Sequence, residues 1–216
     1  MDGCCIHIAQ NVTDLGVEID CNLKYDTHIN NIIGKAYARV GVLFKGFASR
    51  NLHILRQAFI TYVRPILEYA SSVWAPYLLK HINAIEKVQK RFTKRIYSLS
   101  HLSYPERLAA INLEPLELRR LKNDLVMYYK CLNNLVALPS DVYFCQNLQA
   151  SQTRSGGNRL MVPLCSTNHF KNDFFNRCLN CYNNLPAQVV NANSVVSFKK
   201  LLNNTDLYVY LHCNYF

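Results

Sequence analysis

The chain has 216 residues, of which 50% are hydrophobic and 18% are charged, and 24 Lys and Arg against 14 Asp and Glu give it a formal charge of +10. This composition excludes a disordered tail and a collagen-like repeat. The length suffices for one large domain or two small ones with ordinary apolar cores. An excess of positive charge in a chain with so few charged residues predicts a partner that carries phosphate groups. Nucleic acid is the first candidate for this partner and an anionic membrane is the second.

The positive charge is confined to one part of the sequence. Between Gly34 and Arg95 there are 12 Lys and Arg but only two acidic residues, Glu68 and Glu86. The rest of the chain holds 12 basic and 12 acidic residues, so it is neutral. The whole net charge therefore belongs to this one stretch.

The N-terminal segment predicts a short β-hairpin. Cys5–Ala9 and Leu15–Ile19 alternate in hydrophobicity, and Asn11 and Thr13–Asp14 between them are turn formers. A loop from Asp20 to Asp26 should follow the second strand.

Helices are predicted for most of the rest. Thr27 is expected to cap a first helix that ends near Phe44. A second helix should begin near Leu52 and kink or break at Pro65. The later helices are expected at Lys80–Tyr97, Tyr104–Ile111, Pro115–Asn134, about Asn172–Asn183 and Ser194–Asn203, with a possible short strand at Leu160–Val162.

The helix at Lys80–Tyr97 has two opposite faces at 100° per residue. One face is apolar, with Ile82, Ile85, Val88, Phe92 and Ile96, and the other is cationic, with Lys87, Lys90, Arg91 and Lys94. A plain solvated surface is the alternative. Surface helices usually interleave charges of both signs to gain i,i+4 pairs, and this row has no acids, so phosphate binding is favoured.

Other chemical sites are weaker candidates. Cys178 and Cys181 have the spacing of half a zinc site, but no second pair follows, and buried structural thiols explain them better. Ser155–Gly157 lacks the phosphate-loop pattern. The acidic residues near the hairpin contain no adjacent pair for two-metal chemistry: Asp14, Glu18, Asp20 and Asp26. We expect no catalytic residue, metal, cofactor or small-molecule substrate.

The cellular setting is also predicted. The chain has nine cysteines, an odd number, and its first residues show neither a basic nor an apolar leader pattern. The longest uncharged stretch, between Arg177 and Lys199, contains five Asn and Pro186, which a bilayer core would not tolerate. We expect reduced thiols, no membrane span and an intracellular location, in the nucleus or the cytoplasm.

Several motifs follow one another along the chain from about Val12 to Leu202. They are Asp14-Leu15-Gly16-Val17, Asp20, Leu23, His28-Ile29, Val63-Arg64-Pro65-Ile66-Leu67-Glu68-Tyr69-Ala70, Val73-Trp74, Pro76, Lys87-Val88-Gln89-Lys90-Arg91-Phe92, Arg154, Phe174 or Phe175, Arg177 and Tyr182-Asn183-Asn184-Leu185-Pro186. Together these motifs resemble the region downstream of the polymerase active site in jockey-like non-LTR retrotransposon (LINE-type) reverse transcriptases. The family usually has Trp where this chain has Tyr182.

The predicted elements amount to a mainly α fold with a short N-terminal β-hairpin (α+β), an irregular linker at 135–168 and a small C-terminal helical subdomain at 169–216. The resemblance implies that the hairpin at 1–26 is a palm remnant and that the helices at 27–134 form a helical thumb-like bundle. The implied partner is an RNA/DNA duplex (template-primer), held by phosphate contacts. The cations expected to hold it are Lys87, Lys90, Arg91 and Lys94, assisted by Arg64 and Lys35.

The chain departs from the family at the catalytic motif. The family's Ala-Asp-Asp lies upstream of the Leu-Gly-Val element, and this sequence contains no Asp-Asp. We therefore expect a non-catalytic fragment derived from an RNA-directed DNA polymerase, without palm and fingers. Two alternatives remain open. The chain could be a helical protein-interaction module whose exposed apolar surface binds a partner such as the missing polymerase palm. It could also be a transposon remnant without function.

Overall fold

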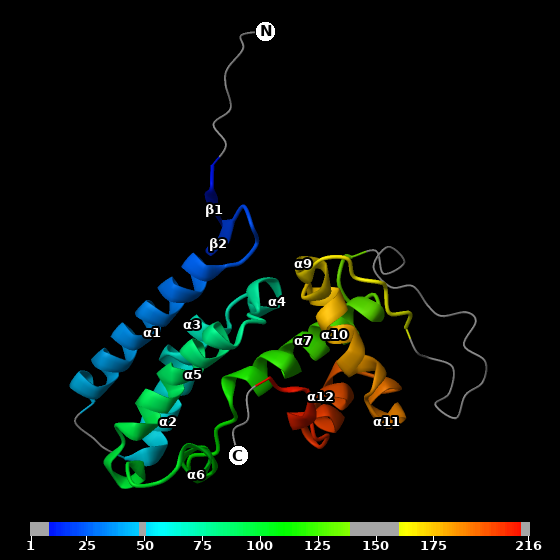
Figure 1. The fold of residues 1–216 in the computed structure, drawn as a ribbon. Coiled ribbons are helices and arrows are strands. Elements are labelled where there is room, and N and C mark those ends of the chain that lie inside the picture. The colour runs from blue at the N-terminus through cyan, green and yellow to red at the C-terminus, as the bar shows by residue number, and fades with distance from the viewer. Residues whose placement is uncertain (1–8, 48–50, 139–159, 213–216) are drawn as a thin grey trace, which may run out of the picture. The chain divides into compact units, whose positions relative to one another are not determined.

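The structure is a computed structural model that describes residues 9–47, 51–138 and 160–212. It is mainly helical, with one two-stranded antiparallel hairpin near the N-terminus, which confirms the predicted fold class (Figure 1). The chain divides into two compact units. Unit 1 comprises Met1–Ala70 and Leu78–Ile111, and unit 2 comprises Ser71–Tyr77 and Asn112–Phe216.

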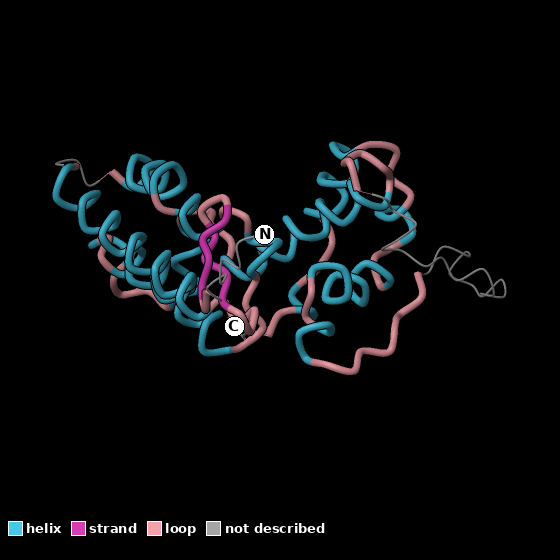
Figure 2. Tube along the Cα trace, turned by 90° about the horizontal axis from the view of Figure 1, so that it is seen from above, coloured by secondary structure: helices cyan, strands magenta, loops and turns pink. Residues whose placement is uncertain are grey.

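The hairpin of unit 1 joins β1 (Asn11–Asp14) to β2 (Val17–Asp20), the two magenta strands of Figure 2. Leu15 and Gly16 form the turn with φ angles of 45° and 83°. Two successive left-handed residues are the pattern of a type I′ turn, whose twist matches that of paired strands. The Tyr69 hydroxyl donates to the Leu15 carbonyl at 2.9 Å and ties this turn to the helices.

The predicted positions of the strands were wrong, although the hairpin itself is confirmed. Asn11–Asp14, expected to contain the turn, is strand β1, and Leu15, expected in the second strand, lies in the turn. All four residues of β1 are exposed, so no apolar alternation marks it in the sequence. Residues 5–8 of the predicted first strand lie outside the described residues.

Helix α1 (Asp26–Gly46) begins after a loop that Asp20 organises. Backbone amides of the loop donate to the Asp20 carboxylate, that of Tyr25 at 2.7 Å. Burial raises the pKa of Asp20, but these hydrogen bonds together outweigh it and hold the pKa below its usual value. Tyr25, at a φ of 57°, is the N-cap, so the prediction that Thr27 caps the helix was wrong.

The second predicted helix breaks where Pro65 interrupts it. Helix α2 (Leu52–Tyr62) is capped by the Asn51 side chain, and α3 (Arg64–Glu68) begins with the proline in its first turn. Proline has no N–H and clashes with the preceding turn, so it cannot continue α2 but fits the start of a new helix.

Helix α5 (Leu79–Lys94) lies beside α1, and the two run in the same direction (Figure 1). Asp26 at the start of α1 pairs with Lys80 at the start of α5, and further along the rings of Phe44 and Phe92 are 5.6 Å apart. Phe59 of α2 stacks on Phe92 at 4.4 Å. The 3₁₀ helix η1 (Tyr97–Leu99) and α6 (Tyr104–Ala110) follow α5 and complete unit 1.

Unit 2 is built around one long helix, α7 (Leu116–Leu132). Its Tyr128 ring packs 5.0 Å from Tyr182, and its Tyr129 ring stacks 4.3 Å from Phe198. Its other elements are α4 (Ser71–Trp74), α9 (Asn168–Lys171), α10 (Phe174–Asn183), α11 (Ala187–Val190), α12 (Val195–Asn203) and η2 (Tyr208–Tyr210).

These units differ from the four segments expected from the sequence. Helix α7, expected in the segment 27–134, packs with α10 and α12 in unit 2, because its aromatic face fits the apolar faces of those helices. Residues 71–77, also expected there, belong to unit 2 as well. Leu160–Val162 forms no strand element, and both backbone groups of Leu160 bond instead to the Asn183 side chain, at 3.0 and 2.9 Å.

Candidate nucleic-acid interface

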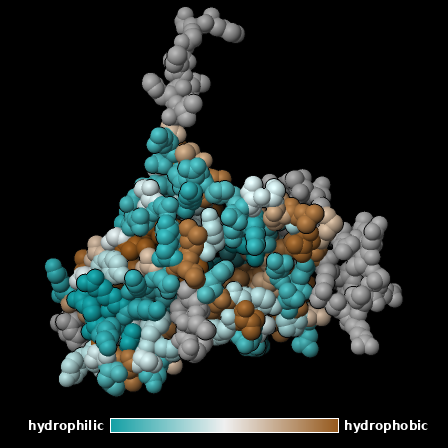
Figure 3. Space-filling model, in the orientation of Figure 1, coloured by the Kyte–Doolittle hydropathy of each residue, from teal (hydrophilic) through white to brown (hydrophobic). Residues whose placement is uncertain are grey.

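Helix α5 buries its apolar face and exposes its cationic face. The predicted apolar residues are at most 3% exposed: Ile82, Ile85, Val88, Phe92 and, just past the helix end, Ile96. Lys87, Arg91 and Lys94 are exposed, and Lys90 is half-buried. A broad hydrophilic area lies over this part of unit 1 in the space-filling view (Figure 3). The sequence pattern therefore predicted both faces of this helix correctly.

The exposed cations form no ion pair among the described residues. In the part of the chain that the structure describes, no ion pair joins Lys87, Arg91 or Lys94 to a carboxylate. The sequence from Lys87 to Pro105 also contains no Asp or Glu. Lys94 instead donates from Nζ to the Ser100 carbonyl at 2.6 Å, which leaves its charge uncompensated. A row of like charges without counter-charges attracts phosphate.

Aromatic rings support several of these cations. The Arg91 guanidinium lies 5.3 Å from the centroid of Tyr37 on α1, and that of Arg95 lies 4.3 Å from the centroid of Phe44. Contact with a ring face restrains a guanidinium and leaves its N–H edge for hydrogen bonds. Arg95 is exposed and extends the row, although it was not among the predicted site residues. Its spacing of four residues from Arg91 was the available signal.

The structure does not bring the two assisting residues into this row. The ring of Tyr37 on α1 marks the side of that helix that contacts Arg91. Lys35 is exposed on α1 but precedes Tyr37 by two residues, a rotation of about 200°, so it lies on the opposite side of the helix. Arg64 on α3 is partly buried, and its Nε lies 3.8 Å from Glu68. A carboxylate this close offsets much of the attraction of Arg64 for phosphate.

Buried polar contacts fix α6 against the base of the cationic face. The Tyr104 hydroxyl donates to the Glu86 carboxylate and accepts from Gln89 Nε2 at 3.1 Å. Arg107 Nε donates to the Thr93 hydroxyl at 3.0 Å. Burial, and then the adjacent Glu86 charge, raise the pKa of Tyr104, so its hydroxyl remains a donor. Sequence reasoning missed this cluster, because α5 alone gives no sign that polar residues on it are buried.

The N-terminal end of α5 is neutralised. Asp26 of α1 accepts a 3.2 Å contact from Lys80 Nζ and a contact from His81. Burial raises the pKa of Asp26, and the contacts with Lys80 and His81 together lower it below its usual value. The uncompensated charge therefore lies on the C-terminal half of α5.

The other carboxylates near the hairpin have structural roles. Glu18 accepts from the Asn31 amide at 2.8 and 2.9 Å, and Asp20 holds the loop before α1. Among the described residues, no three His, Cys, Asp or Glu side chains converge as a metal site would require. Glu18 and Asp20 therefore stabilise the local structure around the hairpin through these hydrogen bonds.

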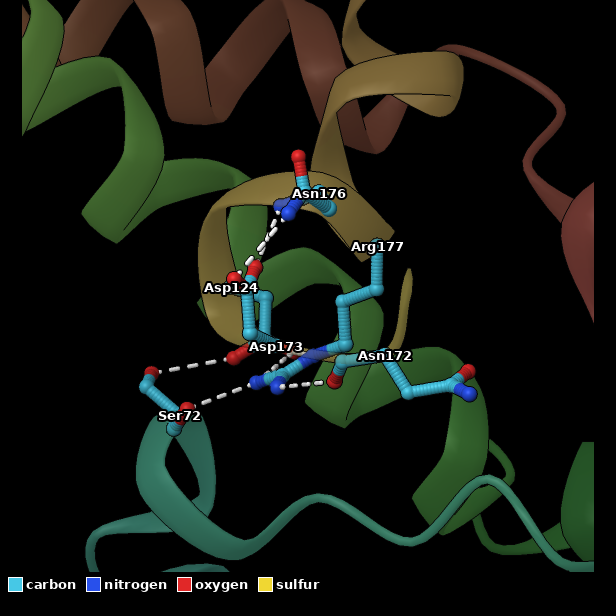
Figure 4. Close-up of polar contacts among 6 residues, drawn as sticks. All are labelled: Ser72, Asp124, Asn172, Asp173, Asn176 and Arg177. Carbon is cyan, nitrogen blue, oxygen red and sulfur yellow. Dashed lines mark hydrogen bonds and ion pairs between the residues drawn. The ribbon is translucent and has the colours of Figure 1, made fainter. Parts of the chain in front are cut away.

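In unit 2, unlike on α5, the charge of Arg177 is compensated by a carboxylate (Figure 4). Arg177 of α10 donates from Nε and Nη2 to Asp124 of α7 at 3.1 and 3.0 Å. It also donates to the carbonyl of Ser72 at 2.7 Å, and the Ser72 hydroxyl donates to Asp124 at 2.9 Å. Burial raises the pKa of Asp124, and Arg177, Ser72 and Arg120 oppose that rise. This network joins α4, α7 and α10, so its charges stabilise unit 2.

The two cysteines of the predicted half zinc site lie in the apolar core of unit 2. Cys178 is 1% exposed and Cys181 is 4% exposed, beside Tyr182 and Leu125. Burial raises the pKa of Cys181 to about 12 and that of Cys178 well above its usual value. Thiols that stay protonated are poor metal ligands and nucleophiles. This agrees with the interpretation of Cys178 and Cys181 as structural cysteines.

Comparisons with known proteins add little to this geometry. No family model matches the chain, and no solved structure matches it. The chain is similar to an uncharacterized protein of Caenorhabditis elegans, with 28% identity over 148 residues that cover 67% of this chain and 74% of that protein. Within the described ranges, no helix is both long and apolar enough to cross a membrane. The resemblance to reverse transcriptases therefore stays a prediction.

Proposed function

We propose that the chain is a non-catalytic nucleic-acid-binding protein that holds the sugar-phosphate backbone of a duplex on the cationic face of α5. The observation that carries this proposal is the row of Lys87, Arg91 and Lys94, exposed on one face without a carboxylate partner among the described residues. Exposed side chains gain nothing from such a row in the free chain, because like charges repel. A polyanion turns that repulsion into attraction and releases its own counterions.

The proposed ligand is an RNA–DNA heteroduplex, and the proposed origin is the thumb of a jockey-like reverse transcriptase. The helical architecture of unit 1 and the order of the motifs support this origin. Phosphate contacts carry no sequence information, so binding should tolerate any base sequence. We further propose that the chain does not polymerise, since it contains no Asp-Asp pair. Nucleotide incorporation on a primed template with Mn²⁺ would contradict that part.

Charge reversal tests the site. We expect the variant Lys87→Glu/Lys90→Glu/Arg91→Glu/Lys94→Glu to lose binding to a heteroduplex at low salt. The matched control reverses four exposed cations that lie outside α5: Arg39, Lys171, Lys199 and Lys200. Both variants change the net charge equally, so only the position differs. Unchanged retention of the α5 variant, or equal loss in the control, would overturn the site.

An apolar interface is the second candidate, and the hairpin is the observation that favours it. Strand β1 is exposed along its whole length, with Val12 57% exposed, and Leu15 in the adjoining turn is 84% exposed. Among the described residues the sheet has two strands, which is marginal for a sheet on its own. A partner that pairs with β1 would bind through backbone hydrogen bonds and apolar contact, so its affinity should change little with salt.

A further inference from the structure

The cationic face of α5 ends at an aromatic side chain that points into solvent. Tyr97, the first residue of η1, is 92% exposed, while Ile96 before it and Leu99 after it are 3% and 4% exposed. The backbone is thus anchored on both sides of a ring that takes no part in the core. Among the described residues Tyr97 is the most exposed aromatic side chain, and an amphipathic ring of this kind is well suited to contact a partner.

Hydrogen bonds link the backbone of Tyr97 to Lys94. Lys94 Nζ donates to the Ser100 carbonyl at 2.6 Å. Ser100 in turn donates to the Tyr97 carbonyl from its hydroxyl at 2.9 Å and from its amide at 3.2 Å. Lys94 and Tyr97 are therefore joined through a single residue, and the 3₁₀ turn presents them together. A backbone restrained in this way loses less conformational freedom when a ligand contacts its side chain.

A ring beside phosphate-binding cations suits one kind of nucleic acid. The faces of paired bases are covered by their neighbours within a duplex, whereas unpaired bases offer both faces. Stacking on an aromatic side chain tolerates any base, as phosphate contacts do. We propose that Tyr97 is a base-stacking residue and that the interface takes a duplex that continues into a single strand, with the unpaired base on Tyr97 and the adjoining phosphates on Arg91 and Lys94. This inference rests on the proposed function.

The experiment compares a short RNA–DNA heteroduplex that is blunt with one that carries a single-stranded extension at one end. We expect the wild-type chain to bind the extended form about 5- to 150-fold more tightly, the range that one stacked base provides. Tyr97→Ala should remove this preference and leave the affinity for the blunt duplex unchanged. Tyr97→Phe should keep the preference, because the ring is retained.

A matched control and a direct signal sharpen this experiment. Tyr62 is 51% exposed on α2, so Tyr62→Ala removes another exposed ring of unit 1 and should leave the preference intact. A fluorescent adenine analogue in the extension should be quenched by the wild-type chain but not by Tyr97→Ala.

Several outcomes would overturn the inference. Stacking would be excluded if Tyr97→Ala preferred the extended duplex as strongly as the wild type does. It would also be excluded if Tyr97→Ala lost affinity equally for the blunt and the extended duplex. In both cases, binding of the wild-type chain to the blunt duplex would still support the proposed function. Binding of a Glu-rich peptide with the same dependence on Tyr97 would replace the nucleic acid by an acidic protein partner. Absence of binding to both duplexes would reject the proposed function together with the inference.

Discussion

The two units use the same residue type in opposite ways. In unit 2, Arg177 donates twice to the buried Asp124 and once to each of two backbone carbonyls, so its charge is compensated within the fold. In unit 1, Arg91 is exposed, lies over a tyrosine ring and has no ion pair with any carboxylate that the structure describes. A compensated charge stabilises the fold that contains it. An uncompensated exposed charge contributes little to stability and is available to a ligand.

The largest expected effect comes from breaking the compensated pair. Asp124→Ala leaves Arg177 and Arg120 without their carboxylate in a buried region, which should reduce the free energy of unfolding by about 3–5 kcal/mol. Denaturant unfolding of the full chain, followed by circular dichroism, measures this loss. Binding of the heteroduplex per folded molecule should not change, because the network lies in unit 2.

An exposed aspartate provides the control for this loss. Asp14, at the end of β1, is exposed, and Asp14→Ala should change the free energy of unfolding by no more than about 0.5 kcal/mol. If Asp124→Ala were as stable as Asp14→Ala, the network of Ser72, Asp124 and Arg177 would not stabilise unit 2 and the comparison would fail.

A smaller effect is expected beneath the cationic face. Tyr104→Phe removes the hydroxyl that donates to Glu86 and accepts from Gln89. A buried carboxylate that loses a donor should cost about 1–3 kcal/mol of unfolding free energy. The same substitution at the exposed Tyr97 should cost almost nothing in stability. Equal costs at the two positions would mean that the buried cluster does not hold α6 on α5.

The smallest effect is a pH dependence in unit 2. His212 contacts Glu117 at 3.1 Å, and this hydrogen bond raises the pKa of His212 above 6.5 against the opposing effect of burial. Its stabilisation is therefore complete below the pKa of the unfolded chain and is lost as pH rises through the higher pKa of the folded chain.

We expect the wild-type chain to exceed His212→Gln in stability by less than about 1 kcal/mol at acidic pH and by almost nothing once the pH is well above the raised pKa of His212. Denaturant midpoints of both proteins across this range measure the difference. A gap that widened as pH rose would have the wrong sign and would exclude a charged His212 as its source.

The sequence predicted what depends on neighbouring residues along the chain. The helical period of α5 separates Val88 and Phe92 from Lys87 and Arg91, and Pro65 marks the end of α2, because both effects act within a few residues. The hairpin turn was misplaced because a left-handed Leu15 is rare and β1 has no apolar pattern.

Features that depend on distant residues were missed. The buried Glu86 meets its donor Tyr104 from α6, and α7 joins unit 2 because Tyr128 and Tyr129 fit side chains more than fifty positions away. The cationic row was found, but its separation from Lys35 required knowing which flank of α1 faces α5. Local patterns thus located the candidate site, and tertiary packing set its limits.

The dependence of heteroduplex binding on salt tests the central claim most directly. If the cations of α5 neutralise phosphates, a plot of log K against log salt concentration for the wild-type chain should have a slope of about −3 to −4. The variant Lys87→Gln/Arg91→Gln/Lys94→Gln removes three of them without adding repulsion, so its slope should fall to about −1. A variant slope equal to that of the wild type, or a wild-type affinity that does not change with salt, would contradict the account.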